Sequence, residues 1–190
     1  MTFRSMAALA GGLLVAACSS LVPATLARMQ AMDPLTADPS AIEVALVLPP
    51  GFAVAPGSAV LTLGAVSGDA RVEERFALKV TPAAISGIDV PPGATASLFR
   101  LTPADARRMR EVQGQIASWK AEDPRGTTGS LSIGLGGCGI GAGAGGDARA
   151  SVLIRPEVDS PFLPLFRDVP VRQLIGPALF DAITPCESRQ

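Results

Sequence analysis

The chain has 190 residues, 48% of them hydrophobic, and its 16 Lys and Arg against 17 Asp and Glu give a net charge of −1. It contains no His, which excludes Ser-His-Asp and Cys-His nucleophiles as well as His-ligated zinc, haem and non-haem iron. The balanced charge gives no indication of nucleic-acid binding, and the length allows one domain with a substantial core. The composition therefore predicts neither an enzyme nor a cofactor.

The first 17 residues have the composition of an export signal. Arg4 is the only charge before an apolar run over residues 6–17. That run is shorter than the roughly 20 residues that a membrane-spanning helix needs. A basic start, a short apolar stretch and small residues near its end are typical of a secretory signal peptide, which we place at residues 1–17.

The end of this signal is more specific. Residues 15–18 read Val-Ala-Ala-Cys, which resembles the lipobox of bacterial lipoproteins, where an aliphatic and two small residues precede the modified cysteine. The resemblance implies cleavage before Cys18, a diacylglyceryl group on its thiol and an acylated amino terminus, enough for stable membrane anchoring. The absence of Asp directly after Cys18 further implies an outer-membrane location, facing the periplasm. A plain signal peptide that contains a cysteine is the alternative.

Residues 18–40 follow as the lipidated cysteine and a tether. They contain three prolines and several Ser, Thr and Asp residues, a composition typical of a flexible linker. From residue 41 the pattern changes to alternating apolar positions. We therefore predict a single β-rich domain over residues 41–190.

Alternation of apolar residues predicts the strands of this domain. The first four are expected at residues 42–48, 59–63, 71–80 and 96–101, with Pro-Pro-Gly turns at 49–51 and 91–93. In the third, Val72, Phe76, Leu78 and Val80 alternate with charged residues. This pattern indicates an antiparallel sheet with one solvent-exposed face.

One amphipathic helix is expected after the fourth strand. Thr102 is a suitable N-cap, Pro103 fits the first helical position, and Asp105 occupies the acidic position of a capping box. An apolar stripe follows at spacings of three and four residues, at positions 106, 109, 112, 116 and 119. Pro124 ends the helix, whose apolar stripe is predicted to cover the sheet.

Strands at 130–135 and 150–154 flank a glycine-rich stretch, residues 134–146, that matches G-x-G-x-x-G twice. A strand-like segment follows it instead of the helix that a dinucleotide site requires. The stretch is therefore predicted to be a flexible hairpin loop. Beyond it, residues 162–175 suggest an edge strand plus loop, and residues 177–183 a short helix.

With Cys18 assigned to lipid by the resemblance, Cys138 and Cys186 remain as a pair. In an oxidising compartment they are expected to form a disulfide. The loop that it would close gives about 4 kcal/mol of stabilisation from chain entropy. Two free buried thiols are the alternative.

Two clusters of charged residues are candidate binding sites. Glu157 and Asp159, with Asp168 near them, have the carboxylates that calcium prefers, and turn or surface roles explain them equally well. Three arginines between residues 107 and 110 lie near the start of the predicted helix. They are suited to lipid headgroups or sugar phosphates, but a solvated helix face is the simpler interpretation.

The fold class predicted is mainly β with one amphipathic helix, as an antiparallel β-sandwich or partly open barrel. The first function hypothesis is a membrane-anchored envelope lipoprotein with a non-enzymatic structural, assembly or protein-interaction role and an envelope protein as partner. The second is a periplasm-facing module that binds a small ligand or envelope glycan in a pocket between helix and sheet. An exposed apolar groove would favour a protein partner, and a closed pocket with converging polar side chains would favour a ligand.

Overall fold

The computed structural model describes residues 36–81, 85–143 and 145–186. A seven-stranded antiparallel sheet has the order β6-β3-β4-β5-β1-β8-β9. Its strands are β1 (Glu43–Leu48), β3 (Val60–Ser67), β4 (Ala70–Thr81), β5 (Thr95–Leu101), β6 (Thr127–Gly134), β8 (Arg149–Arg155) and β9 (Leu163–Pro170). A small second sheet pairs β2 (Phe52–Val54) with β7 (Gly137–Gly139). The predicted signal peptide, Cys18 and most of the predicted tether lie outside the described residues.

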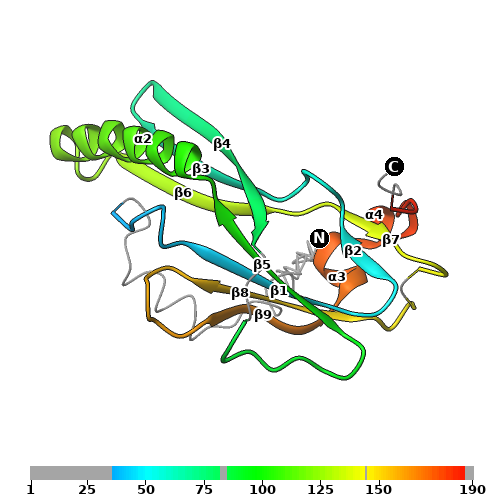
Figure 1. Ribbon diagram of the computed structural model, residues 1–190. Helices are drawn as coiled ribbons and strands as arrows, with labels where there is room; N and C mark the ends of the chain where they lie inside the picture. Colours follow the sequence, from blue (N-terminus) through cyan, green and yellow to red (C-terminus); the bar gives the residue numbers. More distant parts are fainter. Residues whose placement is uncertain (1–35, 82–84, 144, 187–190) are drawn as a thin grey trace, which may run out of the picture.

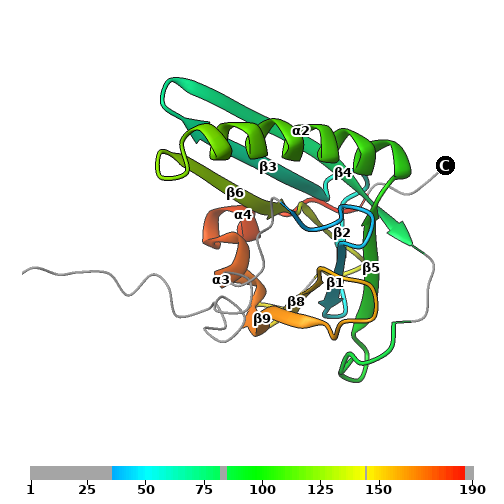
Figure 2. The same ribbon diagram turned by 90° about the vertical axis from the view of Figure 1, so that its left-hand side faces the viewer.

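The large sheet curls into a half-barrel. Strands β3, β4 and β6 lie on one side, β1, β8 and β9 lie on the opposite side, and β5 connects them (Figure 1, Figure 2). The short helices α3 (Val171–Ile175) and α4 (Pro177–Asp181) occupy the open side between the two ends of the sheet (Figure 2). The predicted fold class is confirmed, in its partly open barrel form.

Strand register gives the half-barrel one continuous apolar face. Leu61 pairs with Phe76 across β3 and β4, and Val44 pairs with Phe99 on β5 and with Ile154 on β8. Directly paired residues share a face of the sheet, and all five of these side chains belong to one buried core cluster. The core therefore extends along the concave face from β3 to β8.

Helix α2 (Pro103–Glu122) covers part of this core. The Thr102 hydroxyl accepts a hydrogen bond from the Asp105 backbone N–H at 3.1 Å, which confirms the predicted cap. Buried residues Met109 and Ile116 join the same cluster as the inner side chains of β3 and β4, and the helix lies across β3, β4 and β6 (Figure 2). Among the described residues, no helix combines the length and apolar character needed to cross a bilayer.

Three segments differ from their predictions. Val80, expected on the apolar face, is 62% exposed near the end of β4, although its cross-strand partner Phe99 is buried. Residues 171–175 form α3 instead of a loop, since Val171 turns into the core directly after Pro170 ends β9. Part of the glycine-rich stretch forms β7 rather than a flexible loop, because it pairs with β2.

The helix cap gives a direct test of how α2 is fixed. Thr102→Ala removes the acceptor for the Asp105 N–H and is expected to lower the free energy of unfolding by about 1 kcal/mol. Urea unfolding followed by circular dichroism measures this change. Ser118→Ala, on the exposed face of the same helix, should change stability by less than about 0.5 kcal/mol. Equal losses in the two variants would contradict the role of the cap.

Candidate functional site: an apolar cavity

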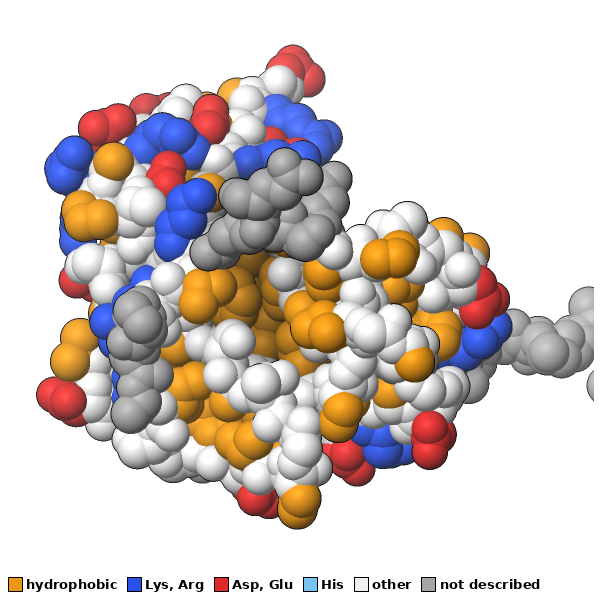
Figure 3. Space-filling view, turned by 45° about the vertical axis from the view of Figure 1, so that its right-hand side comes forward, with side chains coloured by type: hydrophobic (Ala, Val, Ile, Leu, Met, Phe, Trp, Pro, Cys, Tyr) orange, Lys and Arg blue, Asp and Glu red, His pale blue; other side chains and the backbone are white. Residues whose placement is uncertain are grey.

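A cavity of about 520 Å³ lies between the concave face of the half-barrel and the elements on its open side. Strands β1, β6, β8 and β9 contribute to its lining, and so do β2, β7, α3 and α4. Every lining side chain is apolar, and the remaining lining residues are glycines. Figure 3 shows this hollow, which is lined with hydrophobic side chains.

Burial of the lining residues distinguishes the floor of the cavity from its mouth. Six of them are buried, namely Leu46, Leu48, Phe52, Ala150, Ile154 and Val171. At the other extreme, Leu179 of α4 is 67% exposed. The buried residues of β1, β2, β8 and α3 thus form the floor of the cavity, whereas the half-buried lining residues of β6 and β9 and the exposed Leu179 of α4 lie toward solvent.

Val152 of β8 lines the cavity and lies at an irregular point of the sheet. The pairing of β8 with β9 shifts register on both sides of Val152, whereas the pairing of β8 with β1 is regular and places Val152 opposite Leu46. Irregularities of this kind bend a strand and re-aim its side chains. Val152 lines the cavity together with Leu46.

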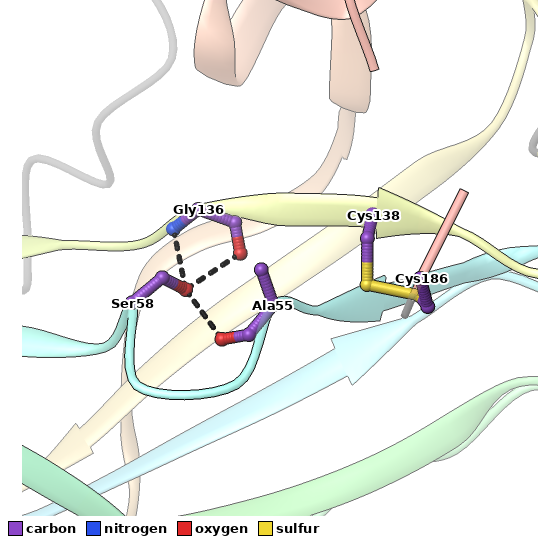
Figure 4. The surroundings of a disulfide bond; sticks show 5 residues. All are labelled: Ala55, Ser58, Gly136, Cys138 and Cys186. Atoms are coloured by element: carbon purple, nitrogen blue, oxygen red, sulfur yellow. Dashed lines mark hydrogen bonds between the residues drawn. A yellow bond between two sulfur atoms is a disulfide. The ribbon is translucent and has the colours of Figure 1, made fainter. Parts of the chain in front are cut away.

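The wall formed by β2 and β7 depends on two glycines. The ring of Phe52 lies so close to Gly137 that a Cβ on the glycine would be 2.0 Å from the ring's Cζ atom. At Gly136, the Ser58 hydroxyl lies 2.9 Å from the carbonyl oxygen and accepts a hydrogen bond from the N–H at 3.0 Å (Figure 4). Close backbone approach therefore explains why glycines occupy this part of the chain.

The C-terminal segment is fastened to the same wall. Cys138 of β7 and Cys186 lie at disulfide distance, with an S–S separation of 2.06 Å (Figure 4). Next to them, the Gly139 N–H donates to the Thr184 carbonyl at 2.9 Å and the Cys186 N–H donates to the Gly139 carbonyl at 2.8 Å. The pair that the sequence suggested is thus brought together, and it secures the segment that follows α4.

The acidic residues considered for calcium are not gathered into a site. Asp168 pairs with Arg149 at 2.9 Å, and Glu157 and Asp159 are exposed. Within the part of the chain that the structure describes, no group of three or more acidic or cysteine side chains is arranged to hold a metal ion. Cys18, the predicted lipidation site, lies outside the described residues.

Two of the three arginines near the start of α2 contact other parts of the folded domain. The Arg108 guanidinium lies 4.8 Å from the centroid of the Phe76 ring. Arg110 donates to the Asp38 carboxylate at 2.5 Å and to the Ser40 hydroxyl at 2.8 Å. Hydrogen bonds from Ser40, followed by the one from Arg110, lower the pKa of Asp38. These contacts attach the end of the predicted tether to α2.

The binding pocket expected between helix and sheet is in a different place, because no residue of α2 lines the cavity. The sequence signals for the observed cavity were the apolar alternation at Leu131, Ile133 and Leu135 and the apolar segment 162–175. Neither signal showed that these segments face one another. Comparison of the chain with family models, curated proteins and solved structures gives no match.

The Cys138–Cys186 link is predicted to hold the α3–α4 wall. Replacing both cysteines with Ala should lower the free energy of unfolding by about 2–4 kcal/mol, because the unfolded chain loses a constraint on 48 residues. Hydrogen exchange should accelerate most over residues 171–185, which include α3 and α4. Unchanged protection there, relative to β3 and β4, would contradict this role, as would free thiols at both positions in unreduced protein.

Proposed function

We propose that this domain binds an apolar small molecule without catalysing a reaction, and that a lipid on Cys18 holds it at the membrane of the cell envelope. One observation carries the binding proposal: a cavity of about 520 Å³ lined only by apolar side chains and glycine. Ligand sites in proteins usually measure roughly 300–1,000 Å³ and are mainly apolar. The size and chemistry of this cavity therefore suit a small hydrophobic ligand.

The lining argues against a glycan as ligand. A sugar carries hydroxyl groups, and each one that enters an apolar cavity without a partner loses its hydrogen bonds to water. A hydrocarbon loses none, and it gains free energy in proportion to the apolar area removed from water. Of the two ligand classes predicted from the sequence, the apolar side chains of the lining therefore favour a small apolar molecule over a glycan.

A structural or protein-interaction role receives less support. Outside the cavity, the large hydrophobic residues that are exposed in the described part of the chain belong to separate elements and loops, namely Val66, Val80, Val90, Ile140 and Val158. Single exposed hydrophobic residues are normal on protein surfaces, whereas interaction sites present contiguous patches. By the criterion stated above, a lining without converging polar side chains leaves two candidates for the cavity, an apolar small molecule and an apolar segment of a protein partner. The volume of about 520 Å³ is that of a small-molecule site, and for this reason we propose the small molecule.

The location and the binding proposal are compatible. The Val-Ala-Ala-Cys motif ending at Cys18 suggests export and lipid attachment, and a disulfide between Cys138 and Cys186 suits an oxidising compartment. Hydrocarbon chains are abundant beside a membrane. A domain held there on a short segment would encounter apolar ligands at high local concentration.

Blocking the cavity tests the binding proposal. Val152→Trp places a large ring in the cavity from strand β8, and it should weaken binding of an apolar fluorophore such as N-phenyl-1-naphthylamine at least tenfold. Fluorescence titration of the purified chain measures the Kd. Ile133→Trp, which reaches the cavity from β6, should have the same effect.

Leu153→Trp is the matched control for this experiment. Leu153 follows Val152 on the same strand, the regular pairing of β8 with β1 places it opposite Ala45 instead of Leu46, and it does not line the cavity, so this ring lies on the other face of the sheet. The control should bind the fluorophore like the unmodified chain, provided that all variants retain the same circular dichroism spectrum. Failure of the unmodified chain to bind, or equal binding by the three folded variants, would refute the proposal.

Metabolic labelling tests the lipid anchor separately. Cells that produce the chain are given an alkynyl palmitate analogue, and the purified protein is examined for label. We expect label on the unmodified chain and on Cys138→Ala, and none on Cys18→Ala, because the resemblance assigns acylation to the residue-18 position alone. Label that persists in Cys18→Ala would exclude this anchor without affecting the binding proposal.

A further inference from the structure

We infer that the ligand is a single-chain amphiphile, bound through an unbranched hydrocarbon chain, and that the contact between Phe52 and Gly137 sets how much chain the cavity accepts. This inference rests on the proposed function, because it names the ligand of the same cavity. It adds a ligand class and a pair of residues that determine specificity.

The ligand class follows from where polar groups can be placed. No side chain that lines the cavity can form a hydrogen bond, so an unbranched hydrocarbon chain is the part of a ligand that this lining suits best. Envelope molecules that contain such a long apolar part carry their polar group at one end. That group must remain outside, beside the exposed Leu179 of α4, while the chain occupies the cavity.

Phe52 is the bulkiest of the buried side chains that form the floor of the cavity, and only 7% of it is exposed. Its ring rests on Gly137, where the missing side chain leaves the space that the ring occupies. A Cβ at Gly137 would lie 2.0 Å from Cζ and 2.7 Å from Cε2 of the ring. The position of this part of the wall is therefore fixed by a large residue on β2 and the smallest residue on β7.

Two substitutions change the cavity in opposite directions. Phe52→Leu removes ring atoms from the floor of the cavity and lengthens the space available to a chain. Gly137→Ala adds a methyl group where the ring now lies, and we expect the displaced ring to move into the cavity that it lines, which shortens the space. Each methylene that gains or loses room changes the Kd about fourfold, the equivalent of about 0.8 kcal/mol.

The test measures displacement of N-phenyl-1-naphthylamine by saturated fatty acids from octanoate to stearate, in steps of two methylenes. The chain is used without the predicted signal peptide and with Cys18→Ala, so that neither an attached acyl chain nor the apolar run over residues 6–17 competes for the cavity. In this background we expect an optimum chain length, which Phe52→Leu moves at least one step longer and Gly137→Ala at least one step shorter. Each step at the limit, which is two methylenes, should change the Kd by about fifteenfold.

Two matched variants separate specificity from stability. Phe76→Leu makes the same substitution in the core under α2, away from the cavity lining. Gly134→Ala adds the same methyl group on β6, where its nearest neighbour would be the Val60 carbonyl oxygen at 3.9 Å. Both should keep the original optimum even where Phe76→Leu lowers the melting temperature.

The outcomes distinguish this inference from the function on which it rests. No binding of the fluorophore or of any fatty acid refutes both. Binding with the same optimum in Phe52→Leu and Gly137→Ala refutes the inference alone. A lysophospholipid tests whether the polar group remains outside: displacement with the same chain optimum supports the inference, and no displacement overturns the proposed orientation. Tighter binding of a polycyclic hydrocarbon than of any chain would overturn the ligand class.

Discussion

A curled sheet with one apolar face must cover that face along its whole length, and the described part of the chain has one long helix for the purpose. The 20 residues of α2 cover β3, β4 and the adjoining part of β6, where Met109 and Ile116 complete the core. Along β1, β8 and β9 the cover comes from α3 and α4, which have five residues each. Helices this short cannot fill the concavity as α2 does. The cavity forms where this cover is thinnest, so it follows from the way the core is closed.

The register of β1 depends on a charge as well as on apolar packing. Glu43 is the only charged residue of β1, it is only 4% exposed, and its carboxylate pairs with Arg100 on β5 and Arg155 on β8. These two arginines are its direct cross-strand partners. A slip of one residue would turn Glu43 into the apolar face and leave its charge unpaired, which is costly in a protein interior. The ion pairs thus specify the alignment that places Leu46 and Leu48 along the cavity.

Local patterns in the sequence were sufficient for elements whose structure is decided locally. Alternating apolar residues located β1, β4, β5 and β8, and the Thr102–Asp105 cap located the start of α2. The pattern failed where distant contacts decide the conformation. Strand β7 has the composition of a loop, yet Gly137 forms a strand because the Phe52 ring and the β2 backbone lie against it. The cavity was missed for the same reason, because its lining comes from segments up to 133 residues apart, as the positions of Leu46 and Leu179 show.

The glycine-rich stretch, the disulfide and the two short helices act together as one wall. Helices of five residues have little stability of their own, so α3 and α4 depend on what fastens them at each end. On one side they continue directly from β9, where the Val171 N–H donates to the Ala148 carbonyl at 2.8 Å. On the other side, Cys186 is fixed to Cys138. A segment that is fixed at both ends and contains only short helices in between unfolds locally at a lower free energy than the strands opposite it. If the domain binds a ligand as proposed, local opening of this segment lets the ligand enter past Leu179 while the seven-stranded sheet stays intact.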